Sequence, residues 1–138
     1  MERTWLEDVA PQECADLLES SWIGRLGVTV DGHPEIFPVN HVFDRLSGTI
    51  LFPTNARTKL HCALEEPLVA FEVDGVYTDQ LVGWSVLVVG AAQEETDADA
   101  IAWAMAMRRA AWAVSEHTRW LRIHPVKITG RRIFLVGQ

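Results

Sequence analysis

The chain has 138 residues, of which 49% are apolar and 22% are charged, as in an ordinary globular protein with a single domain over residues 1–138. The net charge of −7 argues against nucleic acid as a partner, since DNA phosphates require many lysine and arginine contacts. Two cysteines are too few for a disulfide framework, and the longest apolar stretch is too short to span a membrane. We therefore expect a cytoplasmic protein that acts away from membranes.

The first predicted elements are a helix and a β-hairpin. The helix covers residues 11–21 and begins with Pro11, a residue that suits the first helical turn. A strand over residues 24–30 leads into Asp31-Gly32, a two-residue hairpin signal, and its partner covers residues 34–43. Because proline cannot donate a hydrogen bond to a neighbouring strand, Pro38 places this second strand at a sheet edge or a bulge.

The rest of the chain is predicted to alternate strands with two helices. Strands are expected at residues 49–52, 68–73 and 84–93, a short helix at 57–64, a longer helix at 97–114, and a last hairpin at 119–129 and 131–136 around Gly130. The near-continuous apolar run over residues 86–89 is typical of a strand covered on both faces. The predicted fold is therefore mainly β (α+β): a six- to seven-stranded antiparallel barrel with flanking helices.

The loop between the third strand and the short helix has the composition of a phosphate site. It combines hydroxyl, amide and cationic side chains at Thr54, Asn55, Arg57, Thr58 and Lys59, in a chain with only two lysines. A phosphate is bound by such donors together with the N–H groups of a helix start. The alternative is a solvated turn with ordinary surface cations, and no Walker pattern is present.

Two other segments have both a functional and a structural interpretation. Pro38-Val39-Asn40 offers a kink and an amide beside this loop, but it could equally be a bulge that closes the barrel. Trp84-Ser85-Val86 offers a stacking face and a hydroxyl, but Trp84 could equally be core. Six tryptophans against one tyrosine suit a rich core, a dimer interface or a platform for a planar ligand.

No catalytic residue or metal site emerges from the pattern. The five histidines lack metal-ligand spacing, and Gly83-Trp84-Ser85-Val86-Leu87 departs from the hydrolase motif G-x-S-x-G at its last position. Cys62 is expected to be a small packing residue. His41 is a candidate acid or base only through its closeness to Asn40, and packing or solvent exposure is the favoured interpretation.

The order of several short motifs along the chain resembles one known family. These are Gly24-Arg25-Leu26-Gly27-Val28, residues 34–40, residues 50–54, Arg57-Thr58-Lys59-Leu60, residues 67–74, residues 84–90 and residues 128–132. Each motif is weak alone, but their order and spacing over about residues 12–136 resemble the pyridoxamine 5′-phosphate oxidase-like superfamily, in its short flavin-binding branch. Near Trp120 the chain departs from the family's longer namesake, so vitamin B6 oxidation is not expected.

The resemblance implies a split β-barrel homodimer with flavin mononucleotide (FMN) in two clefts between the subunits. Arg57 and Lys59 would hold the phosphate, assisted by Thr54, Asn55 and Thr58. Further contacts carried over by position come from Pro38, Val39, Asn40, Phe52 and Pro53 at the isoalloxazine edge, from Ser85 between Trp84 and Val86 at the ribityl or phosphate end, and from Trp120 across the interface. Relatives in this short branch also include reductases that use deazaflavin F420 and members that bind heme.

The expected function is therefore a flavin-dependent oxidoreductase acting on a small-molecule substrate or electron donor. The alternatives are a non-catalytic flavin carrier, an F420-dependent reductase and a heme-binding protein of the same fold. F420 has a longer phosphate tail than FMN. Such a tail favours a more extended basic groove than the two cations Arg57 and Lys59 provide.

Overall fold

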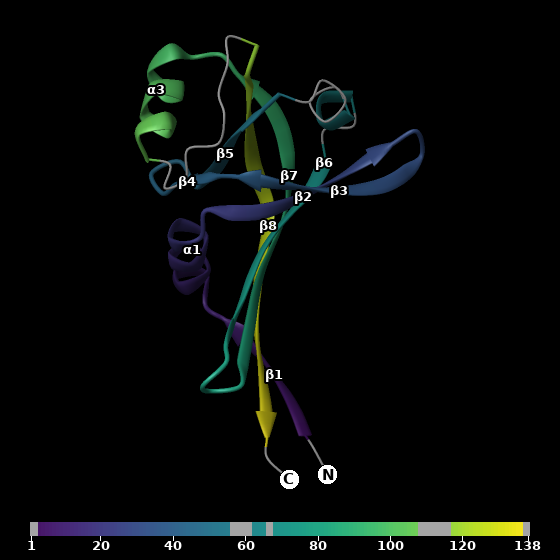
Figure 1. The fold of residues 1–138 in the computed structure, drawn as a ribbon, viewed down its shortest axis with the longest axis vertical. Coiled ribbons are helices and arrows are strands. Elements are labelled where there is room, and N and C mark those ends of the chain that lie inside the picture. Colours follow the sequence, from purple (N-terminus) through teal and green to yellow (C-terminus); the bar gives the residue numbers. More distant parts are fainter. Residues whose placement is uncertain (1–2, 56–61, 66–67, 108–116, 137–138) are drawn as a thin grey trace.

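The computed structural model describes residues 3–55, 62–65, 68–107 and 117–136, which form one antiparallel sheet with helices beside it (Figure 1). The strands are β1 (Arg3–Val9), β2 (Ile23–Val30), β3 (His33–Asn40), β4 (Val42–Asp44), β5 (Thr49–Thr54), β6 (Leu68–Tyr77), β7 (Val82–Glu95) and β8 (Arg119–Val136). The helices are α1 (Pro11–Ser20) and α3 (Ala98–Met107), and residues 62–65 are also helical.

The order of the strands explains the curvature of the sheet. Neighbouring strands follow the order β3-β2-β6-β7-β8-β5-β4, and β1 pairs with β8 beyond this path. Strands β3 and β4 lie at opposite ends of the order, yet only His41 separates them in the chain. The sheet must therefore curl until its two edges meet, which produces the half-barrel seen in Figure 1.

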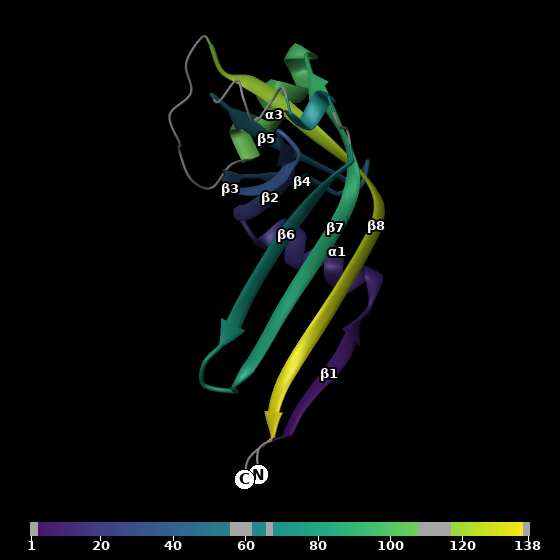
Figure 2. The ribbon, with the colours of Figure 1, turned by 90° about the vertical axis from the view of Figure 1, so that its right-hand side faces the viewer.

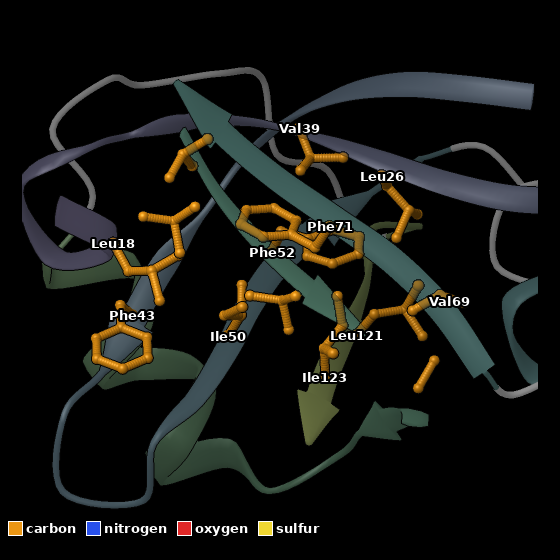
Figure 3. Close-up of a cluster of buried hydrophobic side chains, with 14 of the residues drawn as sticks. Leu18, Leu26, Val39, Phe43, Ile50, Phe52, Val69, Phe71, Leu121 and Ile123 are labelled. Carbon is orange, nitrogen blue, oxygen red and sulfur yellow. The ribbon is translucent and has the colours of Figure 1, made fainter. Parts of the chain in front are cut away.

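The interior of the half-barrel is filled by apolar side chains from most of the strands and from α1. Figure 3 shows part of this core, in which Phe52 of β5 and Phe71 of β6 lie close together. Fully buried members are Leu18, Leu26, Ile50, Phe52, Phe71, Val73, Val86, Val88, Leu121 and Ile123. Leu18 and Cys14 bring α1 into the same cluster, so this helix packs against the core.

Beyond the barrel, the ends of four strands continue as a flat arm (Figures 1 and 2). The arm contains the β6–β7 hairpin, the second half of β8 and β1. The start of β1 and the end of β8, where Arg3 pairs with Val136, lie at its tip in Figure 2. Within the described residues, no helix is long and apolar enough to cross a membrane.

The sequence prediction of a mainly β, antiparallel structure is confirmed, with eight strands in place of six or seven. The strand β1 was missed, and the strand predicted over residues 34–43 is two strands, interrupted at His41. The helix predicted at residues 11–21 is α1, and the helix predicted at 97–114 is confirmed as far as Met107. The edge position inferred from Pro38 is also confirmed, because β3 ends the strand order.

The hairpin predicted around Gly130 is wrong, because β8 runs without a turn from Arg119 to Val136. A Cβ atom on Gly130 would lie 2.6 Å from the Cys14 Sγ and 2.9 Å from the Val9 Cβ. The glycine therefore permits the close approach of α1 and β1 to the sheet, which is a different use of glycine from a turn.

The prediction that β7 is covered on both faces is wrong for the single chain. Val86 and Val88 are fully buried, whereas Leu87 and Val89 are 47% and 38% exposed. The apolar run is therefore a strand with one face in the core and one apolar face open.

Candidate functional site

Most of the predicted cofactor residues gather at the barrel end of the sheet. Pro53 of β5 pairs with Trp120 of β8, and Val39 and Phe52 share the main core. Val39, Phe52 and Trp120 are almost fully buried, and Trp120 packs against Leu51 and Ala104 of α3. A ligand would therefore meet these three positions mainly through their backbone.

The amide of Asn40 is used inside the fold. Its Nδ2 donates to the carbonyl oxygen of Trp22 at 2.7 Å, and the backbone N–H of His41 donates to the same oxygen at 3.2 Å. Asn40 therefore fixes the segment that follows α1 to the end of β3. Pro38 lies on the outer side of β3, where it pairs with Arg25 of β2.

The predicted phosphate loop begins at the end of β5. Thr54 is buried, whereas Asn55 is exposed and accepts a hydrogen bond of 2.5 Å at its Oδ1 from the hydroxyl of Thr118. This bond ties the start of the loop to the segment that leads into β8. Arg57, Thr58 and Lys59 lie outside the described residues.

The remaining predicted residues, Trp84, Ser85 and Val86, lie far along the sheet from Pro53 and Trp120, although Pro38 is level with Leu87 of β7 through Arg25 and Glu72. Pro53 pairs with Trp120, which in turn pairs with Glu95 of β7, and Ser85 lies ten residues before Glu95 on that strand. Ten residues of strand span about 30 Å, which is roughly the diameter of a small domain. One small ligand therefore cannot contact both Ser85 and the Pro53–Trp120 pair within a single chain.

The three β7 residues also face different sides. Val86 is fully buried, and the ring of Trp84 packs against the core above Gly75, where a Cβ atom would lie 2.7 Å from the indole. Ser85 points to the outer face, between Asp74 of β6 and Arg131 of β8. Of the three, only Ser85 offers a polar group to the open side of the sheet.

Arg131 is a candidate binding residue that the sequence prediction missed. Within the described part of the chain, five arginines form ion pairs with carboxylates: Arg25, Arg45, Arg119, Arg122 and Arg132. Within the same part of the chain, Arg131 and Lys127 have no ion-pair partner. Arg131 lies directly opposite Ser85. The sequence prediction places Arg131 at the start of a strand after a turn at Gly130, which gives no sign of Ser85 as its neighbour; only the pairing of β8 with β7 places the two side by side.

His41 does not serve as an exposed acid or base. It is 2% exposed, its Nε2 lies 3.2 Å from the carbonyl oxygen of Leu18, and its ring meets that of Phe71 edge-on at 4.9 Å. Burial lowers the pKa of His41 to about 4, so the ring is neutral near pH 7. The interpretation of His41 as a packed residue is confirmed.

The other titratable groups give no sign of a metal or nucleophile site. The described residues contain no group of three or more histidine, cysteine, aspartate or glutamate side chains able to hold a metal ion. Burial raises the pKa of the Cys14 thiol, which is the unreactive state of a cysteine, and Cys62 packs beside the core as expected.

The outer face of the sheet carries a continuous apolar patch. One row of paired residues crosses it: Ile36 of β3, Gly27 of β2, Ala70 of β6 and Val89 of β7. Leu68 and Leu87 flank this row, and all of its side chains larger than glycine are exposed. Arg25, which bridges Glu72 and Asp74 at 2.9 and 3.0 Å, lies at the border of the patch. We call these six residues the outer apolar patch.

Comparison with known proteins places the chain among relatives of similar length. The sequence model described as pyridoxamine 5′-phosphate oxidase matches residues 10–132. The FAD binding protein from Mycobacterium smegmatis has a similar structure, with a TM-score of 0.78 and 39% identity over 95% of this chain and 100% of the other. An FAD-binding protein from Mesorhizobium loti has a TM-score of 0.78 at 20% identity over 92% and 97% of the two chains, a likeness of fold alone. The uncharacterized protein Rv0080 from Mycobacterium tuberculosis is 30% identical over 88% of this chain and 81% of its own.

Proposed function

The chain belongs to the pyridoxamine 5′-phosphate oxidase family, and from this we propose that it binds flavin mononucleotide and acts as a flavin-dependent oxidoreductase on a small molecule. The observation that carries the proposal is the likeness to the Mycobacterium smegmatis protein, which extends over the full length of a chain described as FAD-binding. FMN and FAD share the isoalloxazine ring and the first phosphate, so the same residues would serve either.

The chemistry of the described residues fits a phosphate-bearing cofactor. The barrel end supplies Thr54 and Asn55, which precede Arg57 and Lys59 in the sequence, and the arm supplies the hydroxyl of Ser85 beside Arg131, which has no ion-pair partner among the described residues. Hydroxyls, amides and guanidinium groups are the usual donors to phosphate. When bound, the flavin supplies the electron-transfer chemistry, and the protein holds, orients and shields it.

We further propose that the working unit is a homodimer and that each cofactor lies between two copies. The predicted contacts at Pro53 and Trp120 lie about 30 Å from Ser85 along β7 in one chain, so a second copy has to supply one of these two sets. The outer apolar patch offers the surface for such a pairing, since neighbouring exposed apolar side chains are typical of interaction sites. Pairing through it would also cover the second face of β7.

The absorption spectrum of protein purified without added cofactor tests the flavin proposal. We expect flavin bands, and we expect chromatography of the released cofactor to identify FMN. If it identifies FAD, the cofactor in the proposal changes and the rest of the proposal stands. A deazaflavin band would replace flavin by F420, and a Soret band would replace it by heme. A colourless protein that leaves the fluorescence of added FMN unquenched contradicts the proposal.

Variants separate the phosphate site from the interface. In Arg57→Ala combined with Lys59→Ala, we expect weaker flavin binding with the dimer retained. In Val89→Lys, at the centre of the patch, we expect a monomer by light scattering together with loss of flavin. Leu46→Lys, a change at a fully exposed leucine away from the sheet, is the control and should keep both. A Val89→Lys protein that stays dimeric contradicts the assigned interface.

A non-catalytic flavin carrier is the second candidate function. The observation in its favour is that His41, the histidine beside the candidate site, is buried, neutral and bonded to Leu18. The two functions differ in turnover. The oxidoreductase proposal requires that the bound flavin be reduced by an electron donor and reoxidised by a substrate in repeated cycles, whereas a carrier exchanges its flavin without such cycles.

A further inference from the structure

A cavity of about 660 Å³ lies between the end of α1, β4 and α3. Both helices lie on the same side of the barrel in Figure 1, and the β2–β3 hairpin extends to the other side. The volume falls within the range of small-molecule sites, which is about 300–1,000 Å³. None of the residues predicted to contact the flavin lines this cavity.

The walls of the cavity are aromatic and largely preformed. Ala100, Trp103 and Met107 line it from α3, at a spacing that places them on one face of the helix. Trp22 lines it from the segment after α1, and the two bonds that its carbonyl accepts from Asn40 and His41 hold this segment in place. Trp22 and Trp103 are 40% and 38% exposed, so both retain open indole surface.

The charged groups of the cavity are already paired. Arg45 lies 2.6 Å from Asp16 and 3.3 Å from Glu19, and Arg122 lies 2.6 Å from Glu95 and 3.5 Å from Asp44. An ionic ligand would have to break one of these pairs, which leaves a partly buried charge without a partner. The cavity therefore suits a ligand without net charge.

Among the described residues, one that lines the cavity, His41, carries a buried acceptor atom without a hydrogen-bond partner. His41 is the most buried of the lining residues. Because the Leu18 carbonyl only accepts, the Nε2 of His41 carries the proton and its Nδ1 carries a lone pair. Within the described residues this Nδ1 is buried without a hydrogen-bond partner. A buried polar atom without a partner is unfavourable, and a donor on a ligand would remove this penalty.

We propose that this cavity is a binding site, separate from the flavin site, for a small neutral aromatic molecule whose N–H or O–H group donates to the Nδ1 of His41. The rings of Trp22 and Trp103 supply the apolar and stacking surface. The His41 acceptor selects for a donor, and the internally paired charges select against ions.

Indole is the probe that tests this proposal, because it is flat, neutral and carries one N–H donor. Its matched partner is 1-methylindole, which has the same ring system without the donor. By NMR or calorimetric titration of the protein as purified, we expect indole to bind and 1-methylindole to bind about fivefold more weakly, as for one lost hydrogen bond. In protein labelled with ¹⁵N-histidine, the Nδ1 signal of His41 should shift with indole alone.

A matched pair of substitutions on α3 locates the binding. Ala100→Trp fills the cavity and should weaken indole binding at least tenfold, whereas Ala102→Trp, at an exposed position outside the lining, should leave it within twofold. Trp103→Ala gives a second measurement should Ala100→Trp not fold, with the same expected loss. Absence of indole binding to the unmodified protein, or equal binding to the Ala100→Trp and Ala102→Trp proteins, overturns the site. Equal affinity for the two probes overturns the role of His41.

Discussion

Along β6, Val69, Phe71 and Val73 face the interior and are buried, whereas Leu68 and Ala70 face outward and are exposed. The neighbouring strand β7 repeats this contrast, with Val86 and Val88 inside and Leu87 and Val89 outside. Both faces of the sheet are thus apolar over these strands. The inner face is covered by this chain's own strands and by α1, while none of the described elements covers the outer face.

This difference separates what stabilises the fold from what is available for association. Burial of apolar surface contributes about 25 cal/mol per Å², and this contribution is realised within one chain only on the inner face. The outer apolar patch can realise it only against another molecule, which is why it supports the proposed homodimer. Substitutions on the two faces should therefore affect different measured quantities.

Phe71→Ala on the inner face should have the largest effect on stability. The ring is fully buried and meets the ring of His41, so its removal leaves a cavity in the core. We expect the free energy of unfolding to fall by about 3–5 kcal/mol in urea titrations. Leu68→Ala on the same strand is the matched outer-face control, for which we expect a loss below about 1 kcal/mol. Equal losses would contradict the comparison of the two faces.

The pH dependence of stability should show the burial of His41. Burial lowers the pKa of His41 from 6.5 to about 4, so the unfolded chain takes up a proton at higher pH than the folded chain. The stability from neutral His41 is therefore complete above pH 6.5 and falls as the pH approaches 4. The expected loss is about 3 kcal/mol.

Urea titrations at pH 7, 5.5 and 4 would measure this loss. His41→Gln is the control, since it removes the titrating group and should flatten the pH dependence over this interval. The exposed His33 and His124 are present in both proteins. A wild-type stability that is unchanged between pH 7 and 4 would contradict the burial of a neutral His41.

Much of the fold follows from local sequence patterns. Alternating apolar residues predict β2 and β6, and Asp31-Gly32 predicts the turn between β2 and β3, with positive φ angles at both residues. The strand β1 was missed because its pairing with β8, about 130 residues away in the chain, leaves no local signal. Gly130 was misread for a similar reason, since the contact with Cys14 that requires a glycine comes from α1.

The candidate site was less accessible to sequence reasoning than the fold. Local composition indicates donors for a phosphate at Thr54 and Asn55, but it does not show that Ser85 lies about 30 Å farther along β7. It also gives no hint of Arg131, whose place beside Ser85 depends on the register of β7 with β8. The cavity beside α3 depends on three segments separated by many residues, so no single pattern predicts it.

Gly130→Ala should reduce stability less than Phe71→Ala. It adds one methyl group where Gly130 packs tightly against Cys14 and Val9. That methyl group would lie 2.6 Å from the Cys14 Sγ and 2.9 Å from the Val9 Cβ, so α1 or β1 has to move. We expect a loss of about 1–3 kcal/mol by thermal or urea unfolding. Gly27→Ala on the outer face is the control, because its Cβ atom would meet the Ala70 Cβ at an ordinary 3.4 Å. A Gly27→Ala loss as large as that of Gly130→Ala would contradict the distinction.

Arg25→Gln at the border of the outer apolar patch should have the smallest effect on the separate chain. Arg25 bridges Glu72 and Asp74, but it is about half exposed, and ion pairs of this kind contribute about 0–1 kcal/mol. Partial burial and the neighbouring Asp74 already raise the pKa of Glu72, and Arg25 opposes this shift. If a second copy covers the patch, Arg25→Gln leaves two carboxylates in the interface without their cation, so dimer dissociation should increase far more than stability falls. Sedimentation and urea unfolding of the same variant measure the two effects, and an unchanged dimer would place Arg25 outside the interface.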